Sequence, residues 1–184
     1  MIHIQDSFFL LETPGSTYCF QTTEQGFLQH LYYGRRLYLR GGWEALTPQV
    51  RHLPGNAAGW GNASLEDMAL ETSAPGLGDL RESMVTARAA GGDTLTDFRF
   101  ESASVLPGKP PLPGLPSAYD AAGKCQTLRV NLLEKGGGLR LELYYTTFDD
   151  CDVITRSARL TNTGKQPVTL LRLLSNQVDF AEQD

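Results

Sequence analysis

The stretch KCQTLRVNLLEKGGGLRLELYY, residues 124–145, decides the fold class. Apolar side chains occupy alternate positions before and after a glycine triplet: Leu128, Val130, Leu132, Leu139, Leu141 and Leu143. A period of two places such side chains on one face of an extended chain. The triplet Gly136-Gly137-Gly138 suits a turn between the two runs. The stretch therefore predicts an antiparallel hairpin with one buried face.

The same alternation continues through most of the chain. Further strands are expected over residues 8–12, 17–22, 27–33, 84–89, 96–104, 153–160 and 168–180. Segments 84–89 and 96–104 flank Gly91-Gly92-Asp93 and predict another hairpin. No helical period exceeds about two turns. We predict an all-β antiparallel β-supersandwich of two large packed sheets, with long loops and little helix, in one domain spanning 1–184.

Composition narrows the classes of function. The formal net charge of −5 argues against a nucleic-acid partner, because no basic field is available for phosphates. No apolar run approaches the roughly 20 residues that cross a bilayer, so no membrane partner is expected. Cys19, Cys125 and Cys151 are odd in number and far apart, which favours free buried thiols in a reducing compartment. With no secretory signal at the start, we expect a cytoplasmic protein.

Motifs that carry chemistry are scarce. The sequence has no Gly-x-Ser-x-Gly, no phosphate-binding loop, and no cysteine–histidine spacing suited to zinc. Asp149, Asp150 and Asp152 lie between two expected strands, where a solvated turn is favoured over a calcium site. We therefore expect no catalytic residue, no metal and no cofactor.

The loop-rich region 40–80 holds both tryptophans. An indole face stacks well on a sugar ring, so Trp43 and Trp60 suggest carbohydrate binding. Arg51 or His52, in the same region, would donate to hydroxyls or anions. The alternative is that each tryptophan fixes its own loop to the core, and this alternative is favoured for both, more so for Trp43 than for Trp60.

Residues 109–119, KPPLPGLPSAY, are rich in proline but are not expected to form a flexible linker. Leu112, Leu115 and Ala118 recur every third residue, and polyproline II has three residues per turn. The three side chains would then share one face. We expect a strap that lies across a hydrophobic surface of the same domain.

Several segments together resemble one family, the bacterial α-galactosidases of glycoside hydrolase family 36. The segment 108–119, GKPPLPGLPSAY, is similar to that family's Gly-Lys-Pro-x-Leu-x-Gly-Leu-Pro-Ala-Thr-Tyr stretch. Further similar segments are GDLR at 78–81, TDFRF at 96–100, DVITRS at 152–157 and TNTG at 161–164. Their order and spacing agree over roughly residues 60–180, and several motifs in order are far more specific than one.

The resemblance implies the amino-terminal β-domain of a retaining enzyme acting on melibiose- or raffinose-type galactosides. In that family a (β/α)₈ barrel follows, and its nucleophile lies in a Lys-Trp-Asp motif. None of the four lysines here is followed two residues later by aspartate, so no catalytic residue can be assigned. The barrel is expected after residue 184, where the sequence stops abruptly after a strand.

The same resemblance implies that the domain supports its barrel and neighbouring subunits in a homo-oligomer, with a tetramer expected. Loop 40–62 would reach the active-site rim of a neighbouring subunit, which makes Trp60 and Arg51 the candidate substrate-binding residues. The alternative reading is a free-standing carbohydrate-binding β-sandwich module.

Overall fold

The computed structural model describes residues 1–39, 42–48, 65, 68–94, 96–136 and 138–177. In these residues the strands are β1 (Ile2–Gln5), β2 (Phe8–Glu12), β3 (Ser16–Thr22), β4 (Leu28–Arg35), β5 (Val85–Arg88), β6 (Phe98–Pro107), β7 (Gln126–Glu134), β8 (Leu139–Phe148), β9 (Val153–Asn162) and β10 (Thr169–Leu173). A short 3-10 helix, η1, spans Trp43–Leu46. No helix in the described ranges is long and apolar enough to span a bilayer.

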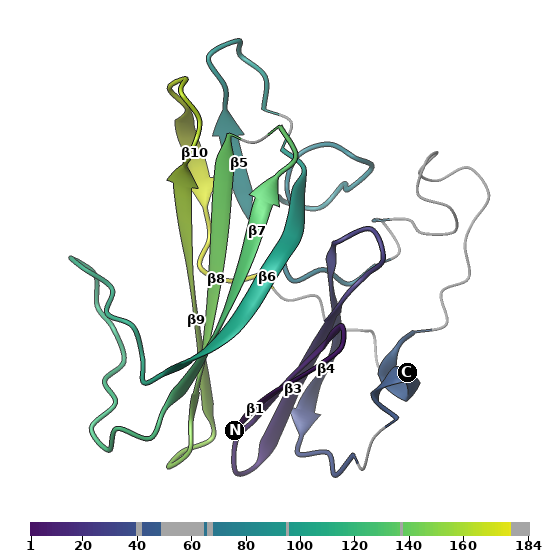
Figure 1. Ribbon diagram of the computed structural model, residues 1–184, viewed down its shortest axis with the longest axis vertical. Coiled ribbons are helices and arrows are strands. Elements are labelled where there is room, and N and C mark those ends of the chain that lie inside the picture. The colour runs from purple at the N-terminus through teal and green to yellow at the C-terminus, as the bar shows by residue number, and fades with distance from the viewer. Residues whose placement is uncertain (40–41, 49–64, 66–67, 95, 137, 178–184) are drawn as a thin grey trace.

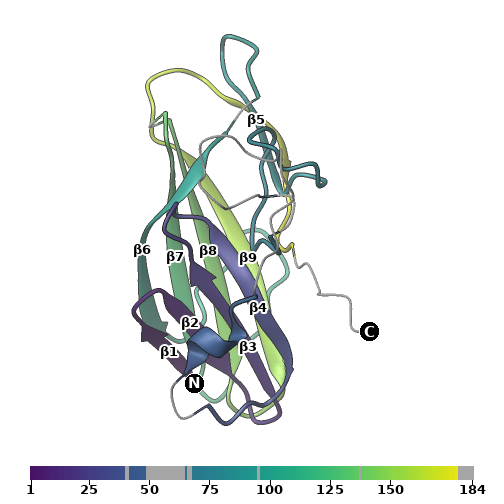
Figure 2. The ribbon, with the colours of Figure 1, turned by 90° about the vertical axis from the view of Figure 1, so that its right-hand side faces the viewer.

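The strands form antiparallel sheets that pack on one another (Figures 1 and 2). One sheet has the order β1-β2-β3-β4 and a second has the order β6-β7-β8-β9. A two-stranded sheet pairs β5 with β10. The prediction of an all-β sandwich is confirmed, and β7 and β8 form the expected hairpin.

The main core lies between the two four-stranded sheets. Phe9, Leu11 and Phe20 face it from the first sheet, and Leu141 and Tyr145 face it from the second. All five side chains are essentially inaccessible to solvent. The Phe20 and Tyr145 rings stack with their centroids 5.0 Å apart, which joins the sheets directly.

A second apolar layer covers the outer face of the β1–β4 sheet. Strand β2 reads Phe-Phe-Leu-Leu-Glu, so both of its faces are apolar and both need cover. Phe8, Leu10 and Cys19 point outward and pack under Trp43 of η1. The Trp43 ring meets Phe8 edge-on, with centroids 6.4 Å apart. Trp43 is therefore the residue that fixes its own segment to the core, as the favoured alternative held.

Two strand predictions were wrong. Segments 84–89 and 96–104 do not pair as a hairpin, because β5 pairs with β10 and β6 pairs with β7. The glycine-rich turn does form, with the Ala89 amide donating to the Asp93 carbonyl at 2.8 Å, but the chain then enters another sheet. The strand expected over 168–180 ends at Leu173, and β1 was not anticipated.

The prediction that the proline-rich strap packs along one apolar face was also wrong. Leu112 is half-buried, but Leu115 is 68% exposed and Ala118 is exposed. The strap connects β6 to β7 and projects to the left of the lower half of the sheet, past β9 (Figure 1). Gly114 has φ of 74°, in the left-handed region, so the segment does not run as one polyproline helix and the three-residue period is broken.

Candidate functional site: a buried ionic network between the sheets

The most concentrated polar chemistry in the described residues surrounds Glu71, inside the sandwich. Glu71 is wholly inaccessible to solvent. Its segment lies beside β4: the Glu71 amide donates to the Leu28 carbonyl at 3.0 Å, and the His30 amide donates to the Ala69 carbonyl at 2.9 Å. These bonds direct the carboxylate into the space between the two sheets.

Four side chains converge on this carboxylate. The Tyr18 hydroxyl lies 2.7 and 2.8 Å from its two oxygens, and the Tyr145 hydroxyl donates to Oε2 at 2.8 Å. His30 Nδ1 lies 2.7 Å from Oε1, and Arg156 Nη1 lies 3.2 Å from Oε2. Tyr18 and His30 belong to the first sheet, whereas Tyr145 and Arg156 belong to the second. The network therefore bridges the sandwich.

Arg156 is itself nearly inaccessible, at 7% side-chain exposure. Its guanidinium donates to the hydroxyls of Tyr18 and Tyr145, at 3.1 and 3.2 Å, and to the Glu71 carbonyl at 3.0 Å. It also donates to the Gln177 carbonyl at 2.8 Å. The planar guanidinium of arginine has five N–H donors and can reach acceptors on several segments at once. The single ammonium group of a lysine could not.

Electrostatic interactions keep both Glu71 and Arg156 charged. Burial alone would raise the pKa of Glu71, but the Arg156 charge and the hydrogen bonds from His30 and Tyr18 outweigh it, so the pKa lies below its ordinary value. Burial raises the pKa of Tyr145 and of Tyr18, and the neighbouring Glu71 charge adds to this. Both phenols are therefore neutral donors to an ionised carboxylate.

The network also holds the end of the described chain. Beyond β10, the Leu174 amide donates to the Met84 carbonyl at 3.0 Å. The Ser73 hydroxyl lies 2.6 Å from Gln177 Oε1, and Arg156 holds the Gln177 carbonyl. Residues 174–177 are thus fixed to the sandwich by polar contacts after the strand has ended.

The family-like motifs supply the other cross-links. In GDLR, Arg81 pairs with Asp79 at 2.9 Å and donates to the carbonyls of Met68 and Leu65 at 2.6 Å. In TDFRF, Arg99 pairs with Asp97 and donates to the Gln25 carbonyl at 2.6 Å.

In DVITRS, Asp152 accepts from the hydroxyls of Thr13 and Ser16, which ties the β8–β9 turn to the β2–β3 turn. Asp149 lies 3.3 Å from the amino terminus. Residues 149–152 form the predicted exposed turn, and Asp149 and Asp152 in it also contact other segments of the chain. Among the described residues, no group of three His, Cys, Asp or Glu side chains is arranged to hold a metal ion.

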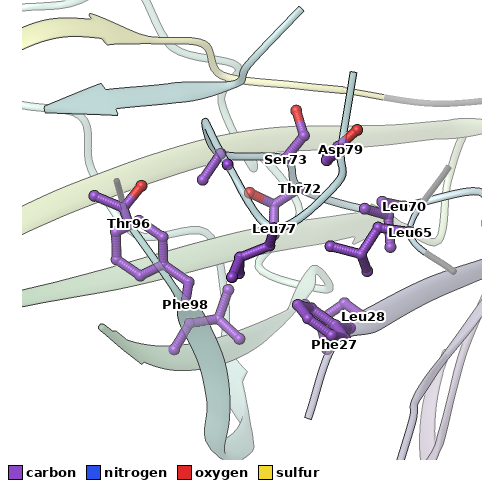
Figure 3. A pocket seen from close by; sticks show the side chains of 13 residues that line it. Phe27, Leu28, Leu65, Leu70, Thr72, Ser73, Leu77, Asp79, Thr96 and Phe98 are labelled. Atoms are coloured by element: carbon purple, nitrogen blue, oxygen red, sulfur yellow. The ribbon is translucent and has the colours of Figure 1, made fainter. Parts of the chain in front are cut away.

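A small cavity lies beneath the GDLR segment (Figure 3). Leu65, Leu70, Leu77 and Phe98 line it together with Asp79, and its volume is about 30 Å³. A cavity of this size has room for water rather than for a sugar.

The two sequence-predicted substrate residues, Arg51 and Trp60, lie outside the described residues. Sequence reasoning did not find Glu71, His30 or Arg156. The available signal was Arg156, which shares the parity of Ile154, Ala158 and Leu160 on β9 and therefore lies on an apolar face. A charged residue on such a face needs a buried partner, but its identity is not visible in the sequence.

Comparison with known families agrees with this architecture. Residues 26–184 match the model of the glycosyl hydrolase family 36 N-terminal domain. The chain belongs to this family. Alpha-galactosidase AgaA of Geobacillus stearothermophilus is 33% identical over 178 residues, which cover 96% of this chain and 24% of AgaA. The bifunctional alpha-galactosidase/sucrose kinase AgaSK of Mediterraneibacter gnavus is 32% identical over 177 residues, covering 95% of this chain and 19% of AgaSK.

Solved structures of alpha-galactosidases superpose closely. The alpha-galactosidase from Lactobacillus brevis has a TM-score of 0.89 at 30% identity, covering 97% of this chain and 25% of that one. A variant of Geobacillus AgaA in complex with raffinose has a TM-score of 0.85 at 33% identity, covering 94% and 24%. The chain spans a quarter or less of the length of these relatives. It corresponds to their N-terminal domain.

Proposed function

We propose that this chain is the non-catalytic N-terminal domain of a retaining α-galactosidase that hydrolyses terminal α-galactosides of the melibiose and raffinose type. The observation that carries the proposal is the alignment of nearly the whole chain with about a quarter of family 36 α-galactosidases.

The proposed lack of catalysis in this domain is supported by the state of three of its least exposed carboxylates. A retaining glycosidase needs two carboxyl groups about 5–5.5 Å apart on either side of the glycosidic bond, one of them as a nucleophile. Glu71 is inaccessible and its oxygens are occupied by donors. Asp79 and Asp97 are each paired with an arginine two residues away. In this proposal the reacting carboxylates belong to the remainder of the protein.

The domain would support the catalytic barrel and the neighbouring subunits. Exposed apolar side chains gather at β10 and just beyond it: Leu170, Leu171 and Leu174 are 41–50% exposed. An apolar surface of this kind is typical of an interface. The contacts of Ser73 and Arg156 with Gln177 hold residues 174–177 against the sandwich. We propose that the barrel packs there.

Oligomeric assembly and the active-site rim belong to the same proposal. The protein would act as a homo-oligomer, a tetramer by family resemblance, in which loop 40–62 borders a neighbour's galactoside site through Arg51 and Trp60. A cytoplasmic location is supported by three free cysteines, of which Cys19 and Cys125 are buried and Cys151 is exposed.

Turnover of an aryl α-galactoside tests this function. The 184-residue chain, shown to be folded by circular dichroism, should give no turnover above buffer, whereas a polypeptide continuing into the barrel should be active. Turnover by the pure chain would contradict the non-catalytic role. An inactive complete polypeptide would contradict the assignment as an α-galactosidase.

The rim assignment has its own test in the complete polypeptide. Trp60→Ala and Arg51→Ala should raise the KM for raffinose and leave the unfolding midpoint unchanged. Tyr119→Ala is the matched control, because Tyr119 is an 84% exposed aromatic side chain on the strap, outside loop 40–62. Unchanged kinetics for both rim variants would remove Arg51 and Trp60 from the site.

A further inference from the structure

A hollow lies on the outer face of the β1–β4 sheet, away from the core network. Its volume is about 460 Å³, within the roughly 300–1,000 Å³ of ligand pockets. Leu10 and Trp43 line it, and both are buried, so they form its floor. Tyr38 and His3 supply the exposed part of the lining, and Glu12 is partly buried between them and the floor at 14% side-chain exposure. The hollow thus combines an apolar floor with polar and aromatic walls.

The wall that carries Tyr38 is held in place by the sheet. The Arg36 amide donates to the Gly15 carbonyl at 2.8 Å, and the Leu37 amide donates to Thr17 Oγ1 at 2.9 Å. The Arg36 guanidinium lies over the Tyr38 ring, 5.7 Å from its centroid. Tyr38 is 85% exposed although its backbone segment is anchored, so its ring is available without any rearrangement of the sheet.

The polar groups offer both acceptors and donors. Glu12 Oε2 lies 3.4 Å from His3 Nε2, and Glu12 Oε1 lies 3.5 Å from Arg36 Nε. Arg36 does not line the hollow, but its charge offsets that of Glu12, so the hollow favours a neutral ligand that carries hydroxyl groups over an anion or a cation.

We propose that this hollow is a binding site for a neutral saccharide. The Tyr38 ring would cover the apolar face of a pyranose, as aromatic side chains do when one ligand face is apolar. Glu12 would accept from sugar hydroxyls, and His3 would donate to or accept from them. This site does not depend on the proposed function, since the described residues that line it all lie between His3 and Trp43 and binding needs no hydrolysis.

Tryptophan fluorescence tests the site directly. Trp60→Phe leaves Trp43, on the floor of the hollow, as the sole tryptophan. Titration of this protein with melibiose or raffinose should give a saturable change in emission, with a Kd on the order of 1 mM. Sorbitol, which has hydroxyl groups but no ring, should give none.

Two tyrosines provide a matched pair of variants. In the Trp60→Phe background, Tyr38→Ala should weaken sugar binding about tenfold, and Tyr38→Phe should retain it because the ring remains. Tyr119→Ala is the control, since Tyr119 is 84% exposed on the strap and does not line the hollow. Both tyrosines are surface side chains, so all variants should keep the circular dichroism spectrum of the parent.

Three outcomes would overturn the proposal. One is the absence of a saturable response in a folded protein. Another is an equal response to sorbitol, which would indicate a nonspecific polyol effect. The third is equal loss of affinity in Tyr38→Ala and Tyr119→Ala.

Discussion

Replacement of Arg156 by methionine tests the network at its most connected point. Methionine keeps most of the apolar stem but removes the positive charge, and it leaves the inaccessible Glu71 carboxylate without its cation. It also removes donors to the Gln177 and Glu71 carbonyls. Breaking one partner out of a buried ion pair costs about 3–5 kcal/mol, because the remaining charge stays desolvated.

That cost is a large part of the 5–15 kcal/mol by which domains are usually stable. With a urea m-value of about 2 kcal/mol/M, the midpoint of unfolding should fall by about 2 M. Arg159→Met is the matched control on the same strand. Arg159 is 63% exposed and lies 3.8 Å from Glu142, so its loss should cost at most about 1 kcal/mol.

Urea unfolding followed by circular dichroism measures both variants. If Arg156→Met does not fold, Arg156→Lys keeps the charge but not the fork of donors and should still lower the midpoint. Arg156→Met combined with Glu71→Gln should be less destabilised than the sum of the two single variants, because the stranded charge is gone. The reasoning is refuted if Arg156→Met is no more destabilised than Arg159→Met. If Arg156→Met does not fold, the same comparison is made with Arg156→Lys.

The remaining predictions concern pH, thiols and the outer layer. The pKa of Glu71 is lower in the folded chain than its ordinary value of 4.5. The ionised carboxylate therefore stabilises the fold above pH 4.5, and this stabilisation is lost as the pH falls through the pKa of Glu71 in the folded chain. Unfolding midpoints measured across this range should drop for the parent and less steeply for Glu71→Gln; parallel profiles would contradict this. Burial raises the pKa of Cys19 and of Cys125 to about 12, whereas Cys151 is exposed, so a thiol reagent at neutral pH should label Cys151 alone until urea is added. Fast labelling of Cys19 in the Cys151→Ser variant would argue against the packing of the outer layer. Trp43→Ala should cost about 3 kcal/mol in urea unfolding, since a buried indole over Phe8 and Leu10 is lost, and a cost below that of Tyr119→Ala would be inconsistent with it.

The sequence predicted the local part of the fold well, for a physical reason. Strands β7, β8 and β9 follow one another in chain order, and their alternating leucines mark both the strand and its buried face. The β5–β10 pairing brings Val85 next to Leu173. No local pattern encodes a contact over such a separation, and the nearby glycine turn favoured the wrong partner for β5.

The candidate site was hidden for the same reason. Glu71 lies in a loop-rich region and its partners come from β3, β4, β8 and β9. The motifs that resemble the family, by contrast, could be recognised from the sequence alone, before the structure showed what their residues contact. In the structure, Arg81, Arg99 and Arg156 from three of those motifs each hold backbone carbonyls of other segments. Their spacing identified the family, and their geometry gives a structural reason for those residues.

The central proposal is that this domain supports an α-galactosidase whose reacting carboxylates lie outside residues 1–184. A mechanism-based inactivator that traps the galactosyl-enzyme of a retaining glycosidase tests it most directly. After reaction with the complete polypeptide, digestion and mass spectrometry should place the label on a carboxylate beyond residue 184, with residues 1–184 unmodified. A galactosyl label on any carboxylate within residues 1–184 would contradict the account.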